Sequence, residues 1–149
     1  MNPGSVWLIA AGALSTIASM IHIACIVFGA RWFRFFGAPE PLIVNYENGA
    51  MGLVWMTAAI SAILAIWAAF ALSAAGLIAR LPLLRTALVI ITAIYLARGL
   101  VLVPALMQAP YPGSTFDLWS SAIVLVYGIV HAVGLRLAWT ALGPKTAPA

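Results

Sequence analysis

The chain has 149 residues, of which 65% are hydrophobic and only 7% charged, and its mean hydropathy is +1.13. A water-soluble domain cannot bury that much apolar surface, so the composition excludes a soluble globular protein and predicts an integral membrane protein. The net charge of +4 comes from seven basic residues against three acidic ones, which are too few and too scattered for a nucleic-acid-binding surface. The single cysteine, Cys25, excludes an internal disulfide.

Four apolar stretches are each long enough to cross the hydrocarbon core of a bilayer, which takes about 20 helical residues. They cover roughly residues 6–29, 49–73, 86–107 and 118–141. The first follows "MNPGS", which carries no positive residue, and it is longer than the apolar core of a signal peptide. We therefore expect it to stay in the protein as a helix.

The connections between these stretches contain interfacial and helix-breaking residues. In the first connection, "RWFRFFGAPEPLIVNYEN", aromatic residues alternate with Arg31 and Arg34 as in an interfacial belt, and "APEP" then breaks the chain. Pro41 is suited to open the second spanning helix, which would place Glu47 in its early turns. The other two connections, "LSAAGLIARLPLLR" and "QAPYPGSTFD", carry glycine and proline signals for turns. The expected fold is one domain over residues 1–149, an all-α, left-handed bundle of four transmembrane helices in up-down-up-down order with short loops.

The basic residues predict the orientation of this bundle. Four spans place both termini on one side of the membrane, where four basic residues lie: Arg80, Arg85, Arg136 and Lys145. Arg31 and Arg34 lie on the opposite side. By the positive-inside rule we expect cytoplasmic N- and C-termini, in a bacterial-type inner membrane.

Arg98 interrupts the third stretch, "ITAIYLARGLVLVPAL", and raises the question of what compensates its charge. An arginine at the bilayer centre costs about 2.5–3.5 kcal/mol even on the lenient insertion scale. A count at about 1.5 Å per residue places Arg98 near the midplane and Glu47 near the outer boundary. Because the arginine stem is long enough to reach outward, we expect Glu47 to be its partner, with Asp117 as the alternative. An ion pair that only fixes helix register and a ligand site are both compatible with the pattern.

The two histidines, His22 and His131, lie on polar faces of the first and fourth stretches. The depth count separates them by about 12 Å, which is unsuitable for axial ligands of one haem. No histidine pair with metal-ligand spacing occurs within a helix, and we expect no metal and no cofactor. A buried, hydrogen-bonded histidine and a proton relay are both compatible with either position.

The sequence indicates the function less strongly than the fold, because the chain contains no nucleophile motif, phosphate loop or dinucleotide fingerprint. We expect an outward-facing intramembrane polar pocket that binds or passes a small solute or a lipid-like ligand, lined by Glu47, Arg98, His22, Tyr46, Tyr95, Asp117 and His131. One alternative is a membrane-embedded acid/base enzyme, isomerase-like, acting on an apolar substrate with Glu47 or His22 as base. Another is a structural subunit of a larger membrane complex. The expected partners are the lipid bilayer and a small apolar or lipid-like ligand, with no nucleic acid, and a homo-oligomer is left open.

Overall fold

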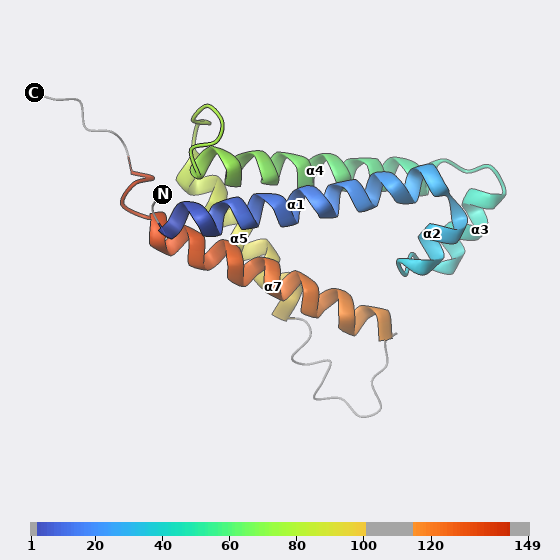
Figure 1. The fold of residues 1–149 in the computed structure, drawn as a ribbon. Helices are drawn as coiled ribbons and strands as arrows, with labels where there is room; N and C mark the ends of the chain where they lie inside the picture. The colour runs from blue at the N-terminus through green and yellow to red at the C-terminus, as the bar shows by residue number, and fades with distance from the viewer. Residues whose placement is uncertain (1–2, 101–114, 144–149) are drawn as a thin grey trace, which may run out of the picture.

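The fold is taken from a computed structural model, which describes residues 3–100 and 115–143 (Figure 1). Every regular element in these two ranges is a helix: α1 (Pro3–Phe28), α2 (Ala30–Phe35), α3 (Glu40–Glu47), α4 (Gly52–Ala74), α5 (Leu84–Leu100) and α7 (Thr115–Ala138). The predicted all-helical class is confirmed for this part of the chain.

Within residues 3–100 and 115–143, three helices are long and apolar enough to cross a membrane: Pro3–Phe28, Gly52–Ala74 and Phe116–Ala138. They correspond to the first, second and fourth predicted spans and indicate an integral membrane protein. The third predicted span, 86–107, coincides with α5 as far as Leu100, and its remaining residues lie outside the described ranges. Lys145 also lies outside them.

The first connection folds into two short helices that the sequence pattern did not predict. Gly29 separates α2 from α1 with a backbone φ of 71°, a conformation that glycine adopts without steric cost. Pro41 lies in the first turn of α3, where its missing N–H costs no helical hydrogen bond. Because α3 ends at Glu47 and α4 begins at Gly52, the expectation that Pro41 opens the second spanning helix, with Glu47 in its early turns, is wrong.

The long helices pack as two antiparallel pairs. α1 lies along α4 and α5 lies along α7, while α1 and α7 join the pairs and α4 touches α5 only sparsely. Figure 1 shows that the pairs are close together at the end near the N-terminus and diverge toward α2 and α3. We call the end near the N-terminus, where the pairs are close together, the closed end. There one apolar core joins all four long helices through Leu8, Ala71, Leu88 and Leu135.

Close backbone contacts hold the closed end together. A Cβ atom built on Gly4 of α1 would lie 2.8 Å from the backbone nitrogen of Ala138 in α7, so only glycine permits this approach. Arg80 donates hydrogen bonds to the carbonyl oxygens of Leu142 and Gly143, at 3.0 and 2.8 Å. The α4–α5 connection and the segment after α7 therefore lie at the same end.

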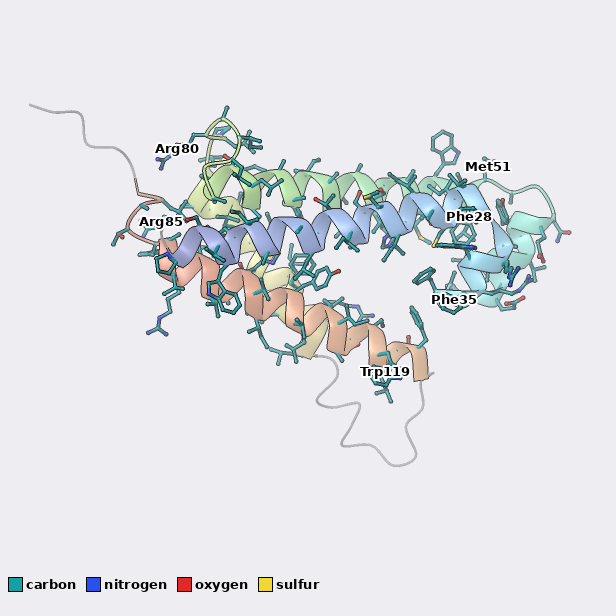
Figure 2. All side chains as sticks on the ribbon, viewed as in Figure 1. Phe28, Phe35, Met51, Arg80, Arg85 and Trp119 are labelled. Carbon is teal, nitrogen blue, oxygen red and sulfur yellow. The ribbon has the colours of Figure 1, made fainter. Side chains whose placement is uncertain are left out.

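Basic side chains gather at this closed end. Figure 2 shows Arg80 and Arg85 there, whereas Phe28, Phe35 and Met51 lie at the opposite end, near α2 and α3. The guanidinium of Arg85 lies 3.4 Å from the centre of the Trp139 ring, a cation–π contact between α5 and the residue that follows α7. The two ends of the bundle thus differ in both charge and aromatic content.

Candidate ligand-binding cavity

A cavity of about 590 Å³ lies where the two helix pairs diverge. α1 and α4 form one wall, α5 and α7 form the other, and Phe36, the residue after α2, contributes at the wide end. This volume falls within the range of about 300–1,000 Å³ that is usual for small-molecule sites. The cavity therefore has the size and position of an interhelical ligand site.

Most of the cavity wall is apolar. On α4, Ile60, Leu64 and Trp67 follow the spacing that places side chains on one helix face, and Ile123 and Val124 contribute from α7. The sequence analysis predicted a polar pocket, whereas polar groups occupy only a few positions of this wall. An apolar ligand body is thus better matched to the cavity than a hydrophilic solute.

Three aromatic rings close the inner end of the cavity, which is its narrow end and faces the closed end of the bundle. Tyr95 on α5 lies edge-on to Trp67 on α4, with ring centres 4.9 Å apart, and to Tyr127 on α7, at 5.7 Å. The hydroxyl of Tyr95 is 3.0 Å from that of Ser15 on α1, and both residues are buried. Because this bond satisfies the buried hydroxyl, the inner end presents mainly ring surface to the cavity.

Arg98 lies on the α5 wall and contacts α7. A Cβ atom on its neighbour Gly99 would lie 2.5 Å from the Cα of Leu125, which places the Arg98 backbone near the middle of α7. Its guanidinium reaches outward, where Nη1 donates a 2.7 Å hydrogen bond to the hydroxyl of Ser121. The side chain therefore extends from the level of Leu125 toward the start of α7.

The expected ion pair between Glu47 and Arg98 is not formed. Glu47 instead accepts two 2.9 Å hydrogen bonds from Arg34, which also binds Glu40. These three side chains are exposed on α2 and α3 and do not line the cavity. The short helices direct Glu47 to Arg34, a partner on the same connection, so a count of depth along the spanning helices could not identify it.

The Arg34 hydrogen bonds change the ionisation of the groups they join. Hydrogen bonding from Arg34, together with its positive charge, holds the pKa of the Glu47 carboxyl below its ordinary value. The hydrogen bonds that Arg34 donates, first to Glu47 and then to Glu40, raise the pKa of Arg34. This ionic cluster ties α2 to α3 at the wide end of the bundle.

The histidines occupy different environments. His22 is half-buried on the cavity wall, and its Nδ1 lies 2.8 Å from the carbonyl oxygen of Ala18. His131 is buried beside Tyr95, with ring centres 4.9 Å apart, and its Nδ1 bonds the Tyr127 carbonyl oxygen at 2.9 Å. If Nδ1 donates in this bond, Nε2 of a neutral ring is an acceptor, and it has no partner among the described residues.

The other candidate residues lie outside the cavity or at its margin. Tyr46 of α3 packs edge-on against Phe33 of α2, with ring centres 5.6 Å apart. Asp117 lies in the first turn of α7, four residues before Ser121 and so on the same helix face. Within residues 3–100 and 115–143, no three His, Cys, Asp or Glu side chains gather in a way that could hold a metal ion.

Several residues that shape the cavity were not predicted from the sequence as site residues, including Trp67, Trp119 and Ser120. Their spacing on α4 and α7 was a usable signal, because Leu64 and Trp67, like Ser120 and Val124, share a helix face. That signal alone does not distinguish a cavity wall from a lipid-facing or packed surface. Comparison of the chain with protein-family models, curated protein sequences and solved structures found no match.

Proposed function

We propose that this chain is a four-span integral membrane protein that binds a lipid-like ligand in the cavity between its two helix pairs. α5 supplies the fourth span, and the bundle has up-down-up-down order. The observation that carries the proposal is the largely apolar cavity of about 590 Å³ between helices of membrane-spanning length. Such a cavity favours a ligand with a substantial apolar body.

The seam between α4 and α5 provides a route into the cavity. These helices pack only sparsely against each other, unlike the α1–α4 and α5–α7 pairs. Ile60 and Ile63 on α4 and Ile94 on α5 line the cavity and are also exposed. In a bilayer such side chains face lipid, so an apolar molecule can enter laterally without crossing water.

The proposed orientation places the cavity in the outer half of the membrane. The closed end carries Arg80, Arg85 and Arg136, and the wide end carries Arg31 and Arg34. The positive-inside rule then assigns the closed end, with both termini, to the cytoplasmic side. The cavity, Arg98 and the α2–α3 cluster lie toward the outside.

The contacts favour a binding role over acid/base catalysis with Glu47 as the base. A general base must come within hydrogen-bond reach of its substrate, and Glu47 is held by Arg34 away from the cavity wall. His22 does line the cavity, but its Nδ1 is engaged by the Ala18 carbonyl. The cavity therefore supports ligand binding more directly than proton transfer.

Filling the cavity tests this proposal. Ile63→Trp places bulk in the cavity, whereas Ile66→Trp makes the same change at an exposed position of α4 that does not line it. Native mass spectrometry of protein extracted in mild detergent should show a co-purifying lipid-like molecule on the wild type and on Ile66→Trp, and much less on Ile63→Trp. Val124→Phe repeats the test from the opposite wall. Unchanged loading of both cavity variants, with unchanged thermal midpoints, would reject the proposal.

A further inference from the structure

We propose that the ligand is a single-chain anionic amphiphile, a long-chain carboxylate, with its head group on Arg98 and its chain directed toward Tyr95. This inference rests on the function proposed above and specifies the class of ligand. It follows from the distribution of charge and apolar surface along the cavity.

Arg98 is a cation on the cavity wall. A guanidinium carries five N–H donors in a planar fork, and to the part of the chain that the structure describes the Arg98 side chain donates one short bond, from Nη1 to Ser121. The ion pairs found within the described residues are both formed by Arg34, with Glu40 and Glu47. Arg98 is exposed on an apolar cavity wall, where an anionic ligand would compensate its charge.

The surroundings of Arg98 suit a lipid head group. Ser121 is buried and anchors the guanidinium from α7, and the neighbouring Ser120 adds a hydroxyl to the cavity wall. Trp119, which also lines the cavity, is 68% exposed, and Figure 2 shows it at the diverging end of α7. Tryptophan is enriched at the level of lipid head groups. The anion-binding part of the cavity therefore lies near the interface, where a carboxylate remains partly hydrated.

The remainder of the cavity suits an acyl chain. From the head-group level at Ser120, the cavity lining on α7 extends to Tyr127, about 10 Å away at about 1.5 Å per residue. Between them the wall is formed by Ile123 and Val124, and the inner end is closed by the aromatic group of Tyr95. Because the helix pairs converge toward this end, the cavity narrows, which favours one chain over the paired chains of a phospholipid. A carboxylate also matches the planar fork of arginine with two parallel bonds.

Brominated lipids provide a direct test, because bromine quenches tryptophan emission on contact and Trp67 lies at the inner end of the cavity. The protein is placed in nanodiscs of zwitterionic lipid at about pH 8, where the carboxylate probe is ionised. Dibromostearate is compared with its uncharged methyl ester and with a brominated phosphatidylglycerol. The signal is the difference in quenching between the protein with Trp67 and its Trp67→Phe variant. This difference excludes the contribution of the other tryptophans.

The wild type should bind dibromostearate about 10- to 100-fold more tightly than the methyl ester, the range expected for hydrogen bonds to a charged group. Arg98→Gln should remove this difference. Ser121→Ala, which removes the anchor of the guanidinium but not its charge, should reduce the difference. Arg31→Gln, an equal change of charge on α2 outside the cavity, should leave it intact.

The outcomes separate this inference from the function on which it rests. Equal affinities of the wild type for acid and ester, or an undiminished difference in Arg98→Gln, would overturn the assignment of an anionic ligand but leave a lipid-binding cavity. Tighter binding of brominated phosphatidylglycerol than of the acid would overturn the single-chain carboxylate. Absence of Trp67-dependent quenching by all three probes would overturn the proposed function itself.

Discussion

Ser19 on α1 and Ser61 on α4 bond each other reciprocally across the helix interface. The hydroxyl of Ser19 lies 2.9 Å from the Ser61 carbonyl oxygen, and the hydroxyl of Ser61 lies 3.0 Å from the Ser19 carbonyl oxygen. Both residues are buried, and their hydroxyl oxygens are 2.9 Å apart. This contact fixes α1 against α4 and makes them one firm wall, from which the α5–α7 pair diverges.

The first prediction concerns the stability of that wall. Ser19→Ala and Ser61→Ala should each lower the thermal midpoint in detergent, because each removes one hydroxyl's bond to the carbonyl oxygen of the facing helix and the contact between the two hydroxyls. A double-mutant cycle should give a coupling energy of about 0.6–1.7 kcal/mol, the range found for hydrogen bonds between membrane helices. Strictly additive losses would show that the two serines act independently.

The second prediction concerns the contact between α5 and α7. Gly99→Ala should destabilise the protein by about 1–3 kcal/mol, because the new Cβ would lie 2.5 Å from the backbone of Leu125. Gly52→Ala is the matched control, since a Cβ there meets nothing within 4 Å and the residue begins α4. That change should be neutral or stabilise by about 0.4–1 kcal/mol. Equal melting of Gly99→Ala and the wild type would place α5 and α7 farther apart than described.

The third prediction concerns the Arg34 cluster and its dependence on pH. The pKa of Glu47 is lowered in the folded state by its bond to Arg34, so this bond stabilises the fold above the unfolded pKa of the carboxyl. The contribution is lost as the pH falls through the lowered folded pKa. At neutral pH, Glu47→Gln should therefore increase hydrogen exchange in α3, and its difference from the wild type should vanish in acid.

Asn45→Gln, an exposed neutral change on α3, serves as the control and should show no such dependence on pH. A difference between Glu47→Gln and the wild type that persists unchanged in acid would contradict the role of the ionised carboxylate. The same measurement on Arg98→Gln should show no effect on α3, because Arg98 does not bind Glu47.

The fourth prediction concerns the orientation of the chain in the membrane. Reporters fused at Ala149 and within the connection 75–83 should read as cytoplasmic, because the basic closed end is assigned to that side. Reporters inserted near Gly113 should read as external. The reverse pattern would place the wide end of the cavity on the inner side and overturn the proposed orientation.

The apolar spans were predictable because the thickness of the hydrocarbon core sets the length of a spanning helix. Apolar stretches of that length are visible in the sequence. The positions of α1, α4 and α7 follow from this constraint. α2 and α3 were not predicted, because short interfacial helices have no such length requirement. Their boundaries depend on Gly29 and Pro41, and the sequence pattern assigned Pro41 to the second spanning helix instead of α3.

The candidate site was predictable only in part, and the reason is physical. Arg98, His22 and Tyr95 were identified because polar groups within a span require compensation, and all three do line the cavity. Glu47 was misassigned because depth along a helix does not determine which partner lies beside it. The apolar wall was missed because a residue such as Ile63 has the same sequence signature whether it faces lipid, protein or a cavity.

The most direct test of the proposed function is a structure of the protein determined in a lipid bilayer. We predict elongated density between the two helix pairs, beside Trp67 and Tyr95, that continues toward Arg98. The proposed function would be contradicted if α4 and α5 closed against each other along their length and eliminated the cavity, or if a helix of a second copy filled it.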